Sequence, residues 1–172
     1  MHFWLNSPFM KTATVKELKT ELSQRKPQEL LELCLRLSKF KKENKELLTY
    51  LLFEADNEAV YIENVKKEIV ESFADINRTS IYFIKKSIRK ILRACTKYIR
   101  YSKKKETEVD IRLFFCHELL RMTPSLKRST VLKNIYFQQV KMVEKVVVKL
   151  HEDLQYDYKI ELEDLQKAFR ER

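Results

Sequence analysis

The chain has 172 residues, with 35 Lys and Arg against 25 Asp and Glu, and it contains no glycine and only three prolines. Hairpin turns and Gly-rich phosphate loops depend on glycine, so the composition disfavours a β-rich fold, a P-loop and a Rossmann fold. Apolar residues make up 44% of the chain, which is too much for a disordered protein. We therefore expect an all-α protein in which residues 10–172 form one helical domain.

The first nine residues, MHFWLNSPF, lack the charged start and the long apolar region of a secretory signal. Met10 is a more natural initiator methionine, so we expect residues 1–9 to be an extension outside the fold. The alternative is that Phe3, Trp4 and Leu5 anchor this arm on the domain. No stretch approaches the ~20 apolar residues of a transmembrane helix, so we expect no membrane partner.

Cys34, Cys95 and Cys116 are far apart in the sequence and lack the spacing of zinc ligands. An odd number of cysteines without a signal peptide indicates reduced thiols in the cytoplasm. Because each lies among apolar residues, we expect all three in the core. His117 is expected to have a structural role, and no catalytic grouping accompanies it.

The first helix is predicted to start at Thr14, because Thr14 and Glu17 have the spacing of a capping box, and to end near residue 25. Pro27 suits the first turn of the second helix. The apolar face of this second helix comprises Leu30, Leu31, Leu33, Cys34 and Leu37.

The polar stretch 41–46 is predicted to interrupt the helices. A third helix follows it, and its inward side is expected to comprise Leu47, Leu48, Leu51, Leu52 and Ala55. Asn57 can cap a fourth helix, which extends to about residue 76.

A long helix over about 80–101, started by Asn77 or Thr79, is expected at the centre of the fold. Its apolar side comprises Ile81, Ile84, Ile88, Ile91, Leu92, Cys95 and Ile99. Thr107 with Asp110 predicts the start of the next helix, which Pro124 ends.

Ser125 or Ser129 is predicted to open the longest helix, which extends to about residue 156. Its apolar residues repeat at intervals of four and three: Tyr136, Val140, Val143, Val147, Leu150 and Leu154. A short helix over 159–169 follows. The total is seven or eight helices in antiparallel pairs. A weak similarity between 39–53 and 97–115 leaves a short HEAT- or armadillo-like α-solenoid open beside a compact bundle.

Positive charge is concentrated in one segment. Residues 76–105 contain eleven basic residues and no acidic one, whereas the rest of the chain has 24 basic against 25 acidic residues. A concentrated basic segment attracts polyanions more strongly than the same charge spread over the surface.

On a helix, much of this charge falls on the side opposite the isoleucines. The candidate binding residues are Lys85, Lys86, Arg89, Lys90, Arg93, Lys97, Tyr98, Arg100, Tyr101 and Lys104. The basic side chains would contact phosphates, and Tyr82, Tyr98 and Tyr101 would stack on exposed bases. We therefore hypothesise a non-enzymatic interaction module that binds RNA or DNA.

Two alternatives for the basic segment stay open. One is an acidic protein partner. The other is internal neutralisation, because acidic residues are frequent in 43–75 and again in 152–164.

A different alternative is a metal-dependent nucleotide pyrophosphohydrolase of the dUTP type. Pairs of carboxylates at a spacing of three residues occur at Glu29/Glu32, Glu43/Glu46, Glu68/Glu71 and Glu161/Asp164. Such pairs hold Mg²⁺ only where they converge in a cleft, and two of them face away from the apolar side of their helices. We therefore predict no catalytic residue, no metal ligand and no cofactor.

The segments 30–55, 97–110 and 151–158 resemble those of a family of small all-helical bacterial proteins. Some members of that family carry a deoxyuridine-triphosphatase label. The resemblance implies an α-helical domain and transfers no functional residue to this chain.

Overall fold

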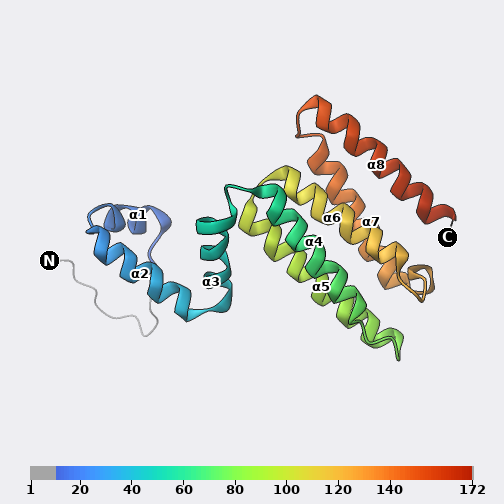
Figure 1. Ribbon diagram of the computed structural model, residues 1–172, viewed down its shortest axis with the longest axis horizontal. Helices are drawn as coiled ribbons and strands as arrows, with labels where there is room; N and C mark the ends of the chain where they lie inside the picture. Colours follow the sequence, from blue (N-terminus) through green and yellow to red (C-terminus); the bar gives the residue numbers. More distant parts are fainter. Residues whose placement is uncertain (1–10, 172) are drawn as a thin grey trace. The chain divides into compact units, whose positions relative to one another are not determined.

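The computed structural model describes residues 11–171, and it is all-α, with 83% of these residues helical (Figure 1). Eight α-helices form in this range, as predicted. The chain divides into two units, 11–48 and 49–171, and each is described by itself. Single-domain folding of 10–172 stays a prediction, and the extension 1–9 lies outside the described residues. No helix in the described range is long and apolar enough to cross a membrane.

The first unit contains α1 (Val15–Ser23), α2 (Pro27–Phe40) and most of α3 (Lys42–Thr49). The capping box of α1 is confirmed, because the Thr14 hydroxyl accepts from the Glu17 amide and the Glu17 carboxylate accepts from the Thr14 amide. The predicted interruption over 41–46 is wrong. Only Lys41 leaves the helical conformation, and α3 starts at the next residue.

No described residue of the first unit is buried, so the predicted apolar face of α2 does not form a core there. Leu31, Leu37 and Cys34 are all exposed, and the core position expected for Cys34 is wrong. A segment of this length is too short to bury a core by itself.

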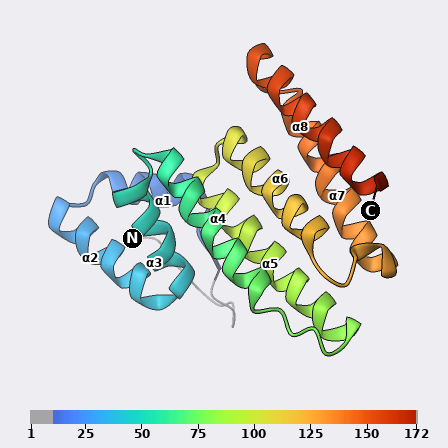
Figure 2. The same ribbon diagram turned by 45° about the vertical axis from the view of Figure 1, so that its right-hand side comes forward.

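The second unit contains a π-helical turn and five α-helices (Figure 2). Their bounds are Tyr50–Glu54 for the π-helical turn, Glu58–Ala74 for α4, Ile81–Ser102 for α5, Lys105–Arg121 for α6, Thr130–Val147 for α7 and Glu152–Glu171 for α8. A 3₁₀ turn, Leu126–Arg128, precedes α7. Successive helices run antiparallel, as Figures 1 and 2 show.

The centre of this unit is α6, which contacts α4 and α5 on one side and α7 and α8 on the other. The expectation that the helix over 80–101 is central is therefore wrong. Buried side chains occupy most sides of α6, and Ile111, Leu113 and Phe115 are almost completely buried. The helix α5, in contrast, buries residues on one side only. The main helix contacts of this unit join helices that are one or two positions apart in chain order, so the compact bundle and the short α-solenoid both stay predictions.

Two of the helix starts in this unit, those of α5 and α6, differ from the prediction. Asn57 caps α4 as expected, but α5 is capped by Ser80, whose hydroxyl accepts from the Phe83 amide. The helix α6 starts at Lys105, so Thr107 is a buried residue of its first turn and not a cap. Ser125 and Ser129 both act as caps, the first for the 3₁₀ turn and the second for α7.

The C-terminal boundary is also corrected. The helix α7 ends at Val147, and α8 begins at Glu152, so one predicted helix to about residue 156 is in fact two. The apolar repeat that begins at Tyr136 is buried through Leu150 within the second unit. Leu51 and Leu52, which were predicted to face inward, are exposed, whereas Tyr50 is buried beside them.

A buried polar contact joins α6 to α7. The Nη1 atom of Arg112 donates to Oε1 of Gln139 at 2.5 Å, and its Nε atom donates to Oε1 of Glu108 at 2.8 Å. Both Arg112 and Gln139 are buried. The pairing therefore satisfies a charged donor that would otherwise lie without an acceptor in the core.

We predict that Gln139→Leu lowers the free energy of unfolding by about 1–3 kcal/mol, because it leaves the Arg112 guanidinium with an unpaired buried N–H. Gln138 is the matched control, since it is the adjacent glutamine on α7 and is exposed. Gln138→Leu should change the same quantity by less than about 0.5 kcal/mol. Urea denaturation followed by circular dichroism measures both, and equal effects of the two variants would contradict the prediction.

Candidate functional site

The helix α5 separates its apolar and basic residues onto opposite sides. Its buried side packs on α4 and α6 and comprises Ile84, Ile88, Ile91, Cys95 and Ile99. Successive buried residues are three or four positions apart, so they occupy one face of the helix. The basic residues are thereby directed away from the core.

Five basic side chains on the opposite side are exposed and have no carboxylate within 4 Å among the residues that the structure describes. We call this set the α5 basic face, and its members are Lys86, Arg89, Lys90, Arg93 and Arg100. The set covers 14 residue intervals of continuous helix, or about 21 Å at 1.5 Å per residue. Lys85 lies at its edge and is half-buried.

The acidic helices of the second unit do not cover this face. The acidic helix α8 packs on α6 and α7. On α4, which does contact α5, Glu58 and Glu68 are directed to partners at the C-terminal end of α5, and Glu63 pairs with Lys66 of its own helix. Within 49–171, the predicted internal neutralisation is therefore limited to one end of the basic segment.

Lys104 forms an ion pair with a carboxylate of α4. Its Nζ atom lies 3.0 Å from Oε2 of Glu58, so Lys104 is left out of the α5 basic face, and its part in binding stays a prediction. The backbone explains the difference, because α5 ends at Ser102 and Lys103 adopts a left-handed conformation with φ of 59°. That conformation ends a helix and takes Lys104 off the straight helical row.

Glu58 links three helices and the π-helical turn. Its carboxylate accepts from Ser102 at 2.5 Å, from Thr107 at 2.6 Å and from the Tyr50 hydroxyl at 2.9 Å, besides the contact with Lys104. Burial alone would raise the pKa of Glu58, but the four donors together outweigh it and hold the pKa below its usual value. The ionised carboxylate therefore stabilises the fold.

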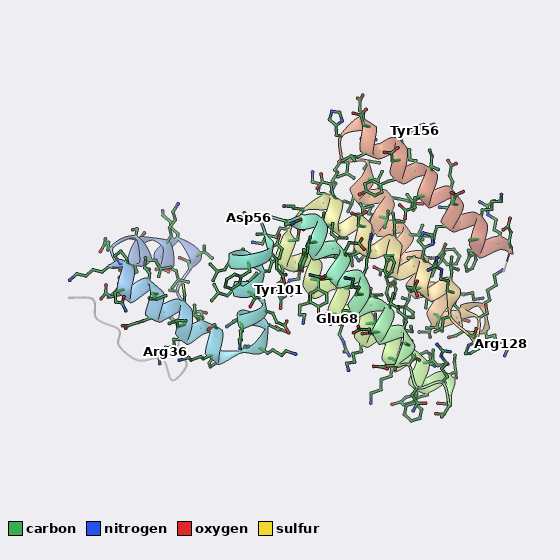
Figure 3. All side chains as sticks on the ribbon, in the orientation of Figure 1. Arg36, Asp56, Glu68, Tyr101, Arg128 and Tyr156 are labelled. Carbon is green, nitrogen blue, oxygen red and sulfur yellow. The ribbon has the colours of Figure 1, made fainter. Side chains whose placement is uncertain are left out.

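Lys97 contacts the two tyrosines beside it. The Lys97 ammonium lies over the Tyr98 and Tyr101 rings, 4.8 and 6.0 Å from their centres. Tyr98 is packed against the core, and its hydroxyl donates to Glu68. Figure 3 labels Glu68 on α4 and Tyr101 on α5. Tyr98 thus has a structural role in this position, and base stacking on its ring stays a prediction.

A different aromatic residue is presented with the basic face. Tyr82 lies in the first turn of α5 with 63% of its surface exposed. Lys86, Arg89 and Arg93 follow it at intervals of four, three and four, so all four residues lie along one side of the helix. The sequence pattern contained this spacing, but nothing in the sequence separated Tyr82 from the tyrosines that pack inside.

The metal-dependent hydrolase alternative requires carboxylate pairs that converge, and members of the predicted pairs have other partners. Glu29 caps its own helix by accepting from the Lys26 amide, Glu68 accepts from Tyr98, and Glu161 lies 3.5 Å from His117. Among residues 11–171, no three His, Cys, Asp or Glu side chains come together to hold a metal ion. The hydrolase alternative has no such cluster to support it in this range.

Comparison with models of known protein families, with curated proteins and with solved structures gave no match. The family resemblance of the sequence therefore stays a prediction.

We predict that Glu58→Gln lowers the free energy of unfolding at pH 7 by about 1–3 kcal/mol, because the neutral amide accepts weaker hydrogen bonds than the carboxylate. The pKa of Glu58 is depressed in the fold, so its contribution is full above the ordinary value of 4.5 and is lost as the pH falls through the folded-state pKa. The difference between variant and wild type should therefore shrink below about pH 4.5.

Glu71 is the control for this experiment, because it lies on the same helix and is exposed. Glu71→Gln should leave the free energy of unfolding within about 0.5 kcal/mol of wild type at every pH. A Glu58→Gln variant whose deficit is the same at pH 7 and at pH 3 would contradict the assigned role of the carboxylate.

Proposed function

We propose that this protein binds a polyanion, namely a nucleic acid, through the α5 basic face. The observation that carries the proposal is the set of five exposed basic side chains along one helix, none of them paired with a carboxylate among the described residues. Unpaired cations in a row raise the local potential, and each contact with a phosphate releases a condensed counterion.

The rigidity of α5 supports the proposal. Its isoleucine side is fixed against α4 and α6, so the basic side chains project from a helix that does not need to fold on binding. A prearranged row loses less conformational entropy when it meets its ligand than a flexible basic segment does. The spacing of about 5–6 Å between helical neighbours is suited to successive phosphates of a backbone.

We expect the triple variant Lys86→Glu, Lys90→Glu and Arg93→Glu to bind heparin and RNA at least about tenfold more weakly than wild type, because three attractions become repulsions. The helical circular dichroism should not change, since all three side chains are exposed. Fluorescence anisotropy at about 50 mM salt, where electrostatic binding is strong, measures the affinity.

The control is the triple variant Lys141→Glu, Lys145→Glu and Lys149→Glu, which changes the net charge equally on exposed residues of α7 and the turn after it. It should retain most of the affinity. If both triple variants lose affinity equally, the net charge of the protein determines binding, and the α5 basic face does not. If the α5 variant binds nucleic acid as tightly as wild type, the proposal is wrong, and an acidic protein becomes the partner to test.

The salt dependence gives a second measurement on the same proteins. Five phosphate contacts on a single strand correspond to a slope of about −3.5 in a plot of log affinity against log salt concentration. Removing three contacts should reduce this slope to about −1.4, whereas the control variant should keep the slope of wild type.

A further inference from the structure

We infer that the ligand of the α5 basic face is a single-stranded nucleic acid, with one unpaired base stacked on Tyr82. This inference rests on the proposed function and deepens it by naming the form of the nucleic acid. It depends on the position, exposure and surroundings of one aromatic ring.

The position of Tyr82 places the ring at one end of the basic row. Lys86 is one helical turn away, and Arg89 and Arg93 continue the same line. A strand whose phosphates follow these cations would bring the base of a neighbouring nucleotide to the ring. Aromatic stacking of this kind tolerates every base, because every base has a π-face.

The exposure of the ring favours a single strand over a duplex. In a duplex the faces of the bases are stacked on one another, so a ring beside the backbone has no base to contact. Tyr82 is 63% exposed, whereas Tyr98 of the same helix is packed against the core. An accessible ring next to unpaired cations is the combination that single-strand binding proteins use.

One aromatic neighbour contacts the Tyr82 ring and leaves it accessible. Phe83 meets it edge to face, with the ring centres 5.4 Å apart, and Phe83 is itself 42% exposed. A tyrosine has only two side-chain torsions, so it loses little rotational freedom when a base stacks on it. The exposed apolar residues at this end of α5 also suit an anionic membrane surface, and the experiment must separate this outcome.

The experiment uses the full chain, a labelled oligouridine of about 12 nucleotides, which is within the span of known single-strand sites, and three variants. Tyr82→Leu keeps apolar area but removes the ring, and it should weaken binding of the oligouridine about 5- to 150-fold. Tyr82→Phe keeps the ring and should stay within about threefold of wild type. Heparin has no bases, so wild type, Tyr82→Leu and Tyr82→Phe should bind heparin with the same affinity.

Tyr156→Leu is the matched control, because Tyr156 is 68% exposed and lies on α8, away from α5 (Figure 3). It should bind the oligouridine like wild type. A second measurement avoids mutation altogether: an oligonucleotide with a photoreactive thiouridine should crosslink to the peptide that contains Tyr82 in the wild-type protein.

Four outcomes would overturn the inference. These are unchanged oligouridine binding by Tyr82→Leu, an equal loss of heparin binding, a crosslink confined to α7 or α8, and binding to a base-paired RNA as tight as to the single strand. If wild type and Tyr82→Leu bind phosphatidylserine vesicles better than they bind oligouridine, the surface is a membrane contact instead. Failure of the proposed function is distinguishable, because the triple reversal on α5 would then leave heparin binding intact.

Discussion

The arrangement of the second unit depends on the burial of α6. This helix buries side chains on most of its sides, and α4, α5, α7 and α8 supply its cover. Each covering helix needs only one apolar face, which leaves its other side open to solvent. On α5 that other side contains basic residues and no acidic one. The exposure of the α5 basic face is thus a consequence of how the core is built.

Polar groups near the core are paired in ways that fix the ends of these helices. Arg112 is held by Glu108 and Gln139, and Glu58 collects donors from the π-helical turn, the end of α5 and the start of α6. No buried side-chain nitrogen or oxygen among the described residues lacks a hydrogen-bond partner. Glu58 also forms an ion pair with Lys104. The α5 basic face, which contains only basic residues without a carboxylate partner in the described range, therefore ends before Lys104.

Local signals allowed much of the fold to be predicted from the sequence. Thr14, Pro27 and Asn57 mark helix starts through their own side chains, so the local sequence was enough to locate these starts. The prediction that α5 is the central helix was wrong. A helix such as α6 shows no amphipathic period, whereas the strong amphipathic period of α5 is typical of a helix at the surface. In the candidate site, charge and period placed the basic row, but the roles of Tyr98 and Lys104 depend on contacts with residues 30 or more positions away. Such contacts leave no local pattern.

The central claim is that a nucleic acid binds along the outward side of α5. Titration of ¹⁵N-labelled protein with an oligouridine, followed by the amide signals in NMR spectra, tests it most directly, because every helix is observed at once. The account predicts that the largest shifts fall on the amides of Tyr82 and of the α5 basic face, with smaller ones on the buried side of α5. Shifts concentrated on α7 and α8, or no shifts at low salt, would contradict it.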